Sequence, residues 1–320
     1  MLYALSSADG VTWLSICVKV MVYASTLLAA GSVLAVLFLR SLPEAEQHRL
    51  RQMAVLMAIA AAILSLLRLP IRASFLMGGT WAGATEPMML NMVMNSPLGT
   101  AIALRLIGLA LLLAIMSSSK IGQGAAALGT VLVAASFAMR GHALEEPRLV
   151  LGLLITAHIL GLAFWIGAFL PLLRLSKQSE PQITGKLAEE FGRKALWVVG
   201  GLVIAGLATL LIVTGGQLAL LTSAYSQFFA IKLALFAGVV GLAAWNKLRL
   251  TPALEQDAPD AATRMSRSLK LESILLVAIL LITAALSTVS APERTIAATT
   301  TKTMLPWAAS LKTNVLKGSA

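Results

Sequence analysis

The sequence predicts an all-α membrane protein, a polytopic bundle of about eight helices that cross a lipid bilayer. Hydrophobic residues make up 58% of the 320 residues and charged residues only 12%, whereas soluble domains have about 25% charged residues. The mean hydropathy of the chain is +0.86. The apolar residues also fall in runs of about 20, the length of helix that crosses a bilayer. Little of the chain is left for a soluble catalytic domain.

Eight apolar runs define the predicted spans in chain order. The first run is too long for a cleavable signal peptide and no basic segment precedes it, so we expect a true span there. Residues 1–290 then form one transmembrane bundle, and residues 291–320 form an external tail, flexible or interfacial. The predicted spans are about 12–39, 51–76, 97–116, 121–140, 149–173, 194–216, 226–248 and 270–290.

Basic residues are distributed unequally between the two sets of loops. The loops after spans one, three, five and seven are rich in Lys and Arg, whereas the opposite loops hold only Arg140 and Arg148. By the positive-inside rule the rich loops are cytoplasmic, so both termini are predicted to lie outside. Topology therefore accounts for most of the net charge of +11. Without a basic soluble domain, nucleic-acid binding is not expected.

Spans three and seven begin alike. SPLGTAIALRL (96–106) and SAYSQFFAIKL (223–233) each place a basic residue, Arg105 or Lys232, nine residues after a Ser. Both spans run from outside to inside, which suggests two parallel four-helix halves, 1–140 and 149–290, as occur in transporters. Chance similarity between leucine-rich helices is the alternative explanation.

His158 lies within the fifth predicted span. It is nine or ten residues from the outer end, about 14 Å at 1.5 Å per residue, and so near the bilayer midplane. Trp165 and Gly161 share its helical face. A histidine at this depth either hydrogen-bonds across a helix pair and aids packing or acts as a ligand or proton carrier. Intramembrane ionisable groups favour the functional interpretation.

His142 stands at the outer end of the fourth span, within MRGHALEEP. A histidine at a membrane edge needs no special explanation. However, Glu145 and Glu146 make this mouth acidic, and Met139 is close in sequence. This group could attract and hold a cation, because imidazole is a common metal ligand.

Methionines gather in the outer loop between the second and third spans. If the segment is helical, Met88 and Met92 are neighbours on one face. Thioether sulfur favours Cu(I) over hard ions, although methionine is also an ordinary apolar gap filler. The five candidate ligands are Met77, Met88, Met89, Met92 and Met94.

Other groups limit or extend the possible chemistry. The lone Cys17 excludes an intramolecular disulfide and any Cys cluster. No catalytic constellation or phosphate loop is present, so we expect neither an enzyme nor ATP-driven transport by this chain alone. The predicted spans also contain ionisable residues with four open roles: snorkelling to the surface, orienting carbonyls, holding an anionic counterpart or stabilising the fold. They are Lys19, Arg68, Arg72, Arg105, Lys232 and Glu272.

Four segments resemble the copper resistance protein D family. HILGLAFWIGA (158–168) is similar to its H-x-x-G-x-x-x-W-x-G-G signature, and GHA (141–143) to its outer histidine motif. WNKLRLTPAL (245–254) resembles its N-R-x-R-L-x-P-x-L segment, and LKLESILLVAILLITAAL (269–286) its last helix. Ala168, Ser226 and Lys247 depart from the family pattern, but none of them removes a candidate ligand.

The resemblance implies a multi-pass protein of the bacterial inner membrane that moves copper from the periplasm toward the cytoplasm. It carries over to His142, His158 and Trp165, whereas the methionine cluster follows from thioether chemistry alone. Met77, Met139, Glu145, Glu146, Arg105 and Lys232 are expected to line or support the path. The expected partners are a copper ion, with Cu(I) favoured, the lipid bilayer and a periplasmic copper-binding protein.

Two other functions stay open. One is a membrane electron carrier with histidine-ligated heme, although His142 and His158 are offset by about 10 Å in depth, and a single bis-His heme needs both at one level. The other is a sensor or assembly partner that binds copper on the periplasmic side without transporting it.

Overall fold

The computed structural model describes residues 10–140, 144, 146–177, 181–214 and 224–286, and these residues form helices with no strand among them. The predicted tail 291–320 lies outside the described residues. Eight long helices follow one another, which confirms the predicted all-α bundle. They are α2 (Gly10–Phe38), α3 (Glu44–Leu76), α5 (Pro97–Leu112), α6 (Lys120–Ala135), α7 (Arg148–Lys177), α8 (Pro181–Thr214), α9 (Ala224–Trp245) and α11 (Ala261–Leu286).

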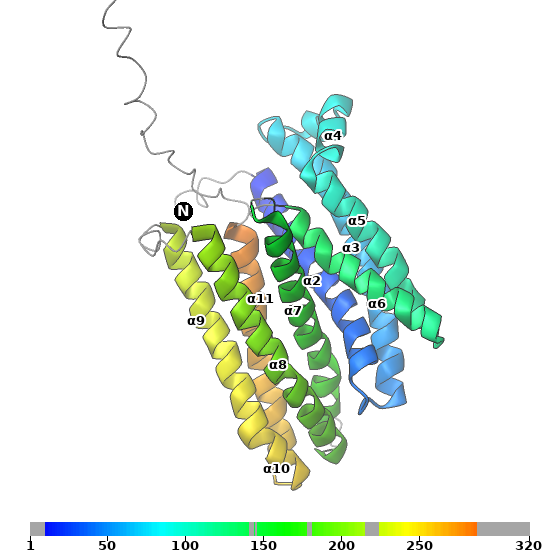
Figure 1. Ribbon diagram of the computed structural model, residues 1–320, viewed down its shortest axis with the longest axis vertical. Coiled ribbons are helices and arrows are strands. Elements are labelled where there is room, and N and C mark those ends of the chain that lie inside the picture. Colours follow the sequence, from blue (N-terminus) through cyan, green and yellow to red (C-terminus); the bar gives the residue numbers. More distant parts are fainter. Residues whose placement is uncertain (1–9, 141–143, 145, 178–180, 215–223, 287–320) are drawn as a thin grey trace, which may run out of the picture. The chain divides into compact units, whose positions relative to one another are not determined.

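Short elements extend or connect these helices. Two 3-10 turns continue α5 and α6, and a π-helical turn joins α9 to the short helix α10. Figure 1 shows α4 at one end of the bundle and α10 at the other. The short elements are η1 (Trp81–Ala84), α4 (Pro87–Met94), η2 (Leu113–Met116), η3 (Ser136–Met139), η6 (Asn246–Leu250) and α10 (Thr251–Glu255).

Seven helices within the described residues are long and apolar enough to cross a membrane, so the chain is a multi-pass membrane protein. Several helices extend beyond the predicted spans at the end that we predict to be cytoplasmic. α3 begins at Glu44 rather than at residue 51, and α8 begins at Pro181 rather than at residue 194. The added turns are polar, and they persist because their carboxylates are held by partners from other elements.

These carboxylates belong to two buried glutamates, Glu46 and Glu190. Glu46, which is 2% exposed, pairs with Arg49 of its own helix and with Arg174 of α7, both at 2.7 Å. The Glu190 carboxylate of α8 accepts hydrogen bonds from the backbone N–H groups of Arg40 and Ser41, at 3.0 and 2.8 Å. Glu46 thus connects α3 to α7, and Glu190 connects the α2–α3 loop to α8.

Helix α2 packs extensively against α3 and α7 and also contacts α6 and α11. Its closest approach is to α7 at Gly31 and Gly167. A Cβ atom on Gly31 would lie 2.2 Å from the Ala163 carbonyl oxygen, and one on Gly167 would lie 2.0 Å from the Gly31 carbonyl oxygen. Glycine at both positions therefore lets the two backbones touch, as is common between membrane helices.

The other long helices surround this pair. In the N-terminal part, α5 packs on α3 and α6; in the C-terminal part, α8 packs on α7. Helix α9 makes its extensive contacts with α11 and with its own η6 turn. Whether the two four-helix halves are related by a repeat stays a prediction.

We predict that Gly31→Leu or Gly167→Leu destabilises the bundle. Either side chain would overlap backbone atoms, and overpacking of this kind costs at least about 1–3 kcal/mol. The melting temperature of the detergent-purified protein should fall, or the protein should fail to elute as a single species in size-exclusion chromatography.

The matched control is Gly200→Leu in α8, where no atom lies within 4 Å of the added Cβ. That variant should behave like the wild type. Equal melting temperatures for the wild type and Gly167→Leu would contradict the prediction.

Candidate functional site

His158 is half-buried in the first half of α7, ten residues from the helix start at Arg148. Lys232 of α9 lies within electrostatic range of its imidazole. The structure thus brings together two residues that the sequence places in separate spans. An ammonium group has no lone pair and cannot ligate a metal, so His158 is the potential ligand of this pair.

Gly161 and Leu162 surround His158 on the same helix. A Cβ on Gly161 would lie 3.1 Å from Leu202 Cδ2 and from Val198 Cγ1, so this glycine lets side chains of α8 approach closely. Leu162 packs beside the cluster of Leu27, Ala30 and Ala163 between α2 and α7. His158 therefore sits between tightly packed helices.

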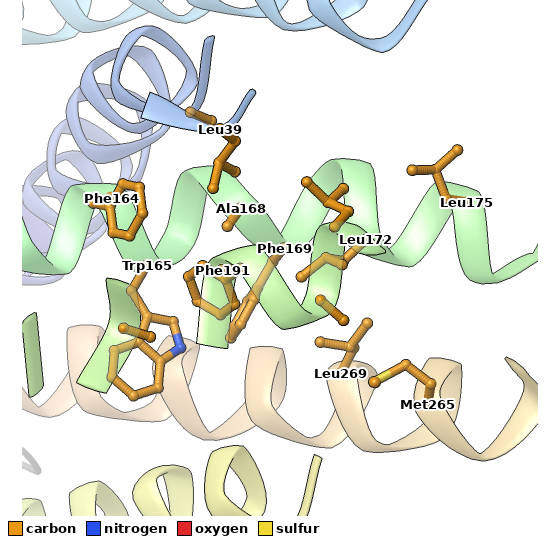
Figure 2. Packing of buried hydrophobic residues seen from close by; sticks show 14 of the residues in the cluster. Leu39, Phe164, Trp165, Ala168, Phe169, Leu172, Leu175, Phe191, Met265 and Leu269 are labelled. Carbon is orange, nitrogen blue, oxygen red and sulfur yellow. The ribbon is translucent and has the colours of Figure 1, made fainter. Parts of the chain in front are cut away.

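Trp165 follows seven residues later on α7, about 10 Å further along the helix. It is 3% exposed and packs edge-on against Phe191 of α8, with ring centroids 6.3 Å apart. Figure 2 shows these two rings from α7 and α8, with Met265 and Leu269 of α11 beyond them. Ala168, one of the three residues that depart from the family pattern, is fully buried in the same apolar cluster.

A cavity of about 360 Å³ opens beside Trp165, in the half of α7 nearer to α10. Its walls come from α7, α8, α9, η6 and α11, and they are mostly apolar. The walls also contain Lys247 and Thr251 and two buried polar residues, Asn246 and Glu272, which are 8% and 1% exposed. The Asn246 side-chain amide donates a hydrogen bond to Glu272 Oε1.

The polar atoms of this cavity are not fully paired. Asn246 Oδ1 and Trp165 Nε1 are buried without a hydrogen-bond partner. The Trp165 indole is near enough to the Glu272 carboxyl group to interact with it, but not in the geometry of a regular hydrogen bond. Because an unpaired buried polar atom is costly, the three residues are suited to holding a small polar or charged species.

The π-helical turn η6 explains the position of Asn246. A π turn widens the helix by one residue and is often found at functional sites. Asn246 begins this turn, and its backbone carbonyl accepts a hydrogen bond from Thr251 Oγ1 at 3.0 Å. The sequence pointed to Trp165 and Glu272 but not to the role of Asn246, whose signal was its match to the first residue of the N-R-x-R-L-x-P-x-L segment.

The structure describes only some of the candidate residues at the predicted outer end of α6 and α7. His142 and Glu145 lie outside the described residues, and Glu146 is exposed. Met139 is half-buried at the end of η3.

The methionine segment forms the helix α4. Met88 and Met92 therefore lie on one helical face, as they would in the helix considered above. Met88 and Met92 are exposed, and so are Met77 and Met94. Met89 differs, because it packs against the apolar cluster of Ala73, Val93, Leu98 and Ile102.

The described residues contain no group of three or more His, Cys, Asp or Glu side chains close enough to hold a metal ion together. The candidate groups are instead spread along the bundle. The methionines of α4 lie at one end, His158 lies deeper, and the Trp165–Asn246–Glu272 cavity lies toward the other end. Arg105 is buried among α3, α5 and η3 and is not part of this series.

Comparison with protein families identifies both parts of the chain. Residues 8–147 match the family model described as copper resistance protein D-like, N-terminal domain. Residues 185–286 match the family model described as copper resistance protein D. No curated protein matches the chain, and no solved structure does.

We predict that Asn246→Leu destabilises the protein by about 1–3 kcal/mol, because it leaves the buried Glu272 carboxyl group without its donor. The double variant Asn246→Leu/Glu272→Leu should recover most of this loss, since both polar partners are then replaced. Thermal unfolding in detergent would measure both effects.

Leu248→Ala, at a side chain that is 70% exposed, is the control in the same turn and should change little. If the double variant is less stable than Asn246→Leu alone, the hydrogen-bonded pair is not the cause of the effect.

Proposed function

Because this chain belongs to the copper resistance protein D family, we propose that it is a copper permease of the bacterial inner membrane. The family and the apolar helices make it a membrane protein that handles copper. Copper moves through this permease from the periplasm to the cytoplasm. Methionine and histidine side chains are its ligands, and both chain termini lie on the periplasmic side.

The position of His158 carries this proposal. Its imidazole is half-buried about 15 Å along α7 at 1.5 Å per residue, beside tightly packed apolar helices. Imidazole binds copper well, and ionisable groups at such depth in membrane proteins mark ion pathways. A neutral imidazole can accept a copper ion and release it without forming a permanent multi-ligand centre.

The exposed thioethers of α4 support an outer capture step. Met88 and Met92 point away from the apolar cluster that holds Met89. Soft, uncharged sulfur suits Cu(I), and its exposure would allow transfer from a periplasmic copper-binding protein. His142, in the same predicted outer region, would extend this step toward His158.

The cavity beside Trp165 supports an inner release step. Glu272 and Asn246 offer oxygen atoms, which hold Cu(I) less tightly than sulfur or imidazole do. The carboxylate would compensate the positive charge of the ion, and weak ligation would favour its departure. The path thus runs from strong soft ligands outside to weak hard ligands inside.

We predict that His158→Ala abolishes copper flux in proteoliposomes, to the level of liposomes without protein, while the protein still inserts and folds. The physical reason is the loss of the histidine ligand that connects the outer ligands to the inner cavity. His48→Ala, at a histidine whose hydrogen bond to Gln52 is exposed, should transport copper like the wild type.

Three results would count against the permease. Unchanged flux in His158→Ala removes the proposed path. Copper binding by the wild type without any flux favours the sensor or assembly partner. A Soret absorbance band in the purified protein favours the heme-binding electron carrier.

We also predict that Met88→Leu/Met92→Leu raises the copper concentration needed for half-maximal flux and leaves the flux at saturating copper unchanged. Leucine keeps the apolar volume but removes both sulfur ligands. Met116→Leu at the other end of the bundle, where the side chain is 48% exposed, is the control. An identical concentration dependence for all three proteins would exclude capture by α4.

A further inference from the structure

Four arginines gather in the N-terminal half of the bundle, at the end that carries α4. Arg68 and Arg72 belong to the last turns of α3, Arg105 lies in the middle of α5, and Arg140 follows η3. Arg105 is 2% exposed and Arg68 is 8% exposed. Arg140 is half-buried and Arg72 is exposed, so the group extends from the surface into the interior.

These side chains are close enough to act on one another. Arg140 and Arg72 lie within electrostatic range of Arg68, and Arg68 and Arg140 lie within range of Arg105. Tyr23 of α2 is near Arg68, Arg105 and Arg140. The four arginines therefore share one region among α2, α3, α5 and η3 with buried Lys19 of α2, which lies within electrostatic range of Arg68, Arg72 and Arg140.

Arg105, the most deeply buried of the four, contacts neutral groups. Arg105 Nε donates to Ser136 Oγ at 3.0 Å, and Arg105 Nη1 donates to Ser65 Oγ at 3.5 Å. Its guanidinium also lies 4.6 Å from the centroid of the Phe137 ring. Arg72 stacks in the same way on Phe75, at 5.2 Å.

Acidic partners lie elsewhere in the described part of the chain. The ion pairs found there use Glu46, Glu189 and Glu190, and none of these pairs includes the four arginines. Guanidinium groups do not lose their protons in proteins. Several such charges in an apolar bundle repel one another and are costly to bury without a counterion.

We propose that this arginine cluster binds an oxyanion of the carboxylate or phosphate type. The planar guanidinium presents paired N–H donors that match the oxygens of such a group. Exposed Arg72 and half-buried Arg140 would receive the anion, and Arg68 and Arg105 would hold it. Its source is a free oxyanion of the periplasm or the phosphate of a lipid headgroup. The proposal does not depend on copper transport.

Thermal unfolding of the full chain in neutral detergent tests the proposal, with inorganic phosphate or succinate added to a chloride buffer. A ligand that binds only the folded state raises the melting temperature, and above the Kd the stabilisation grows with the logarithm of the ligand concentration. We expect this rise for the wild type. In Arg140→Gln the apparent Kd should increase about tenfold or more, as expected for one lost charge-assisted hydrogen bond.

Arg148→Gln is the matched control, because Arg148 is an exposed arginine at the start of α7, at the same predicted face. It should keep the wild-type response. A lipid source gives a different pattern, in which phosphatidylglycerol stabilises the wild type more than phosphatidylcholine does while free oxyanions have no effect. The lipid effect should then also be lost in Arg140→Gln.

The relative stabilities of the wild type and Arg140→Gln give a second readout. Without added anion, Arg140→Gln should be at least as stable as the wild type, because it removes a repelling charge. At saturating anion, the wild type should be the more stable protein. The proposal is overturned if neither free oxyanions nor anionic lipid stabilises the wild type, or if Arg148→Gln loses the response as Arg140→Gln does.

Discussion

The contact between Gly31 of α2 and Gly167 of α7 holds the two parts of the bundle together. No side chain separates the helices there, since a Cβ on either glycine would overlap backbone atoms of the other helix. Because α7 carries both His158 and Trp165, this contact fixes where both side chains lie relative to the N-terminal helices. At the end of α7, the pairing of Arg174 with Glu46 fixes its direction.

Polar groups inside the bundle are separated by kind. Arginines occupy the N-terminal half near α4, the His158–Lys232 pair lies beside α7, and the buried carboxyl group of Glu272 lies near η6. Within a membrane each of these groups needs a partner from the protein or from a ligand. The separation keeps the arginine cluster away from the Glu272 and Asn246 oxygen atoms, so the proposed anion site and the proposed copper path would occupy different parts of the bundle.

Hydropathy predicted the eight helices and their order well, because bilayer thickness sets the length of each apolar run. It misplaced the beginnings of α3 and α8, since those turns are polar and depend on Glu46 and Glu190 binding groups distant in sequence. The place of His158 and Trp165 on one helix also followed from the apolar run that contains both residues, whereas the depth of His158 in the bilayer stays a prediction. The π turn at Asn246 and the meeting of the four arginines could not be predicted, because both arise from tertiary packing.

The sparse packing of α9 has a mechanical consequence. Among the described helices it rests extensively only on α11 and on its own π turn, yet it supplies one wall of the cavity that holds Asn246 and Glu272. The other walls belong to α7, α8 and α11, which are braced by several neighbours. A tilt of α9 alone would therefore change the size of this cavity, because the opposite walls belong to helices with more neighbours.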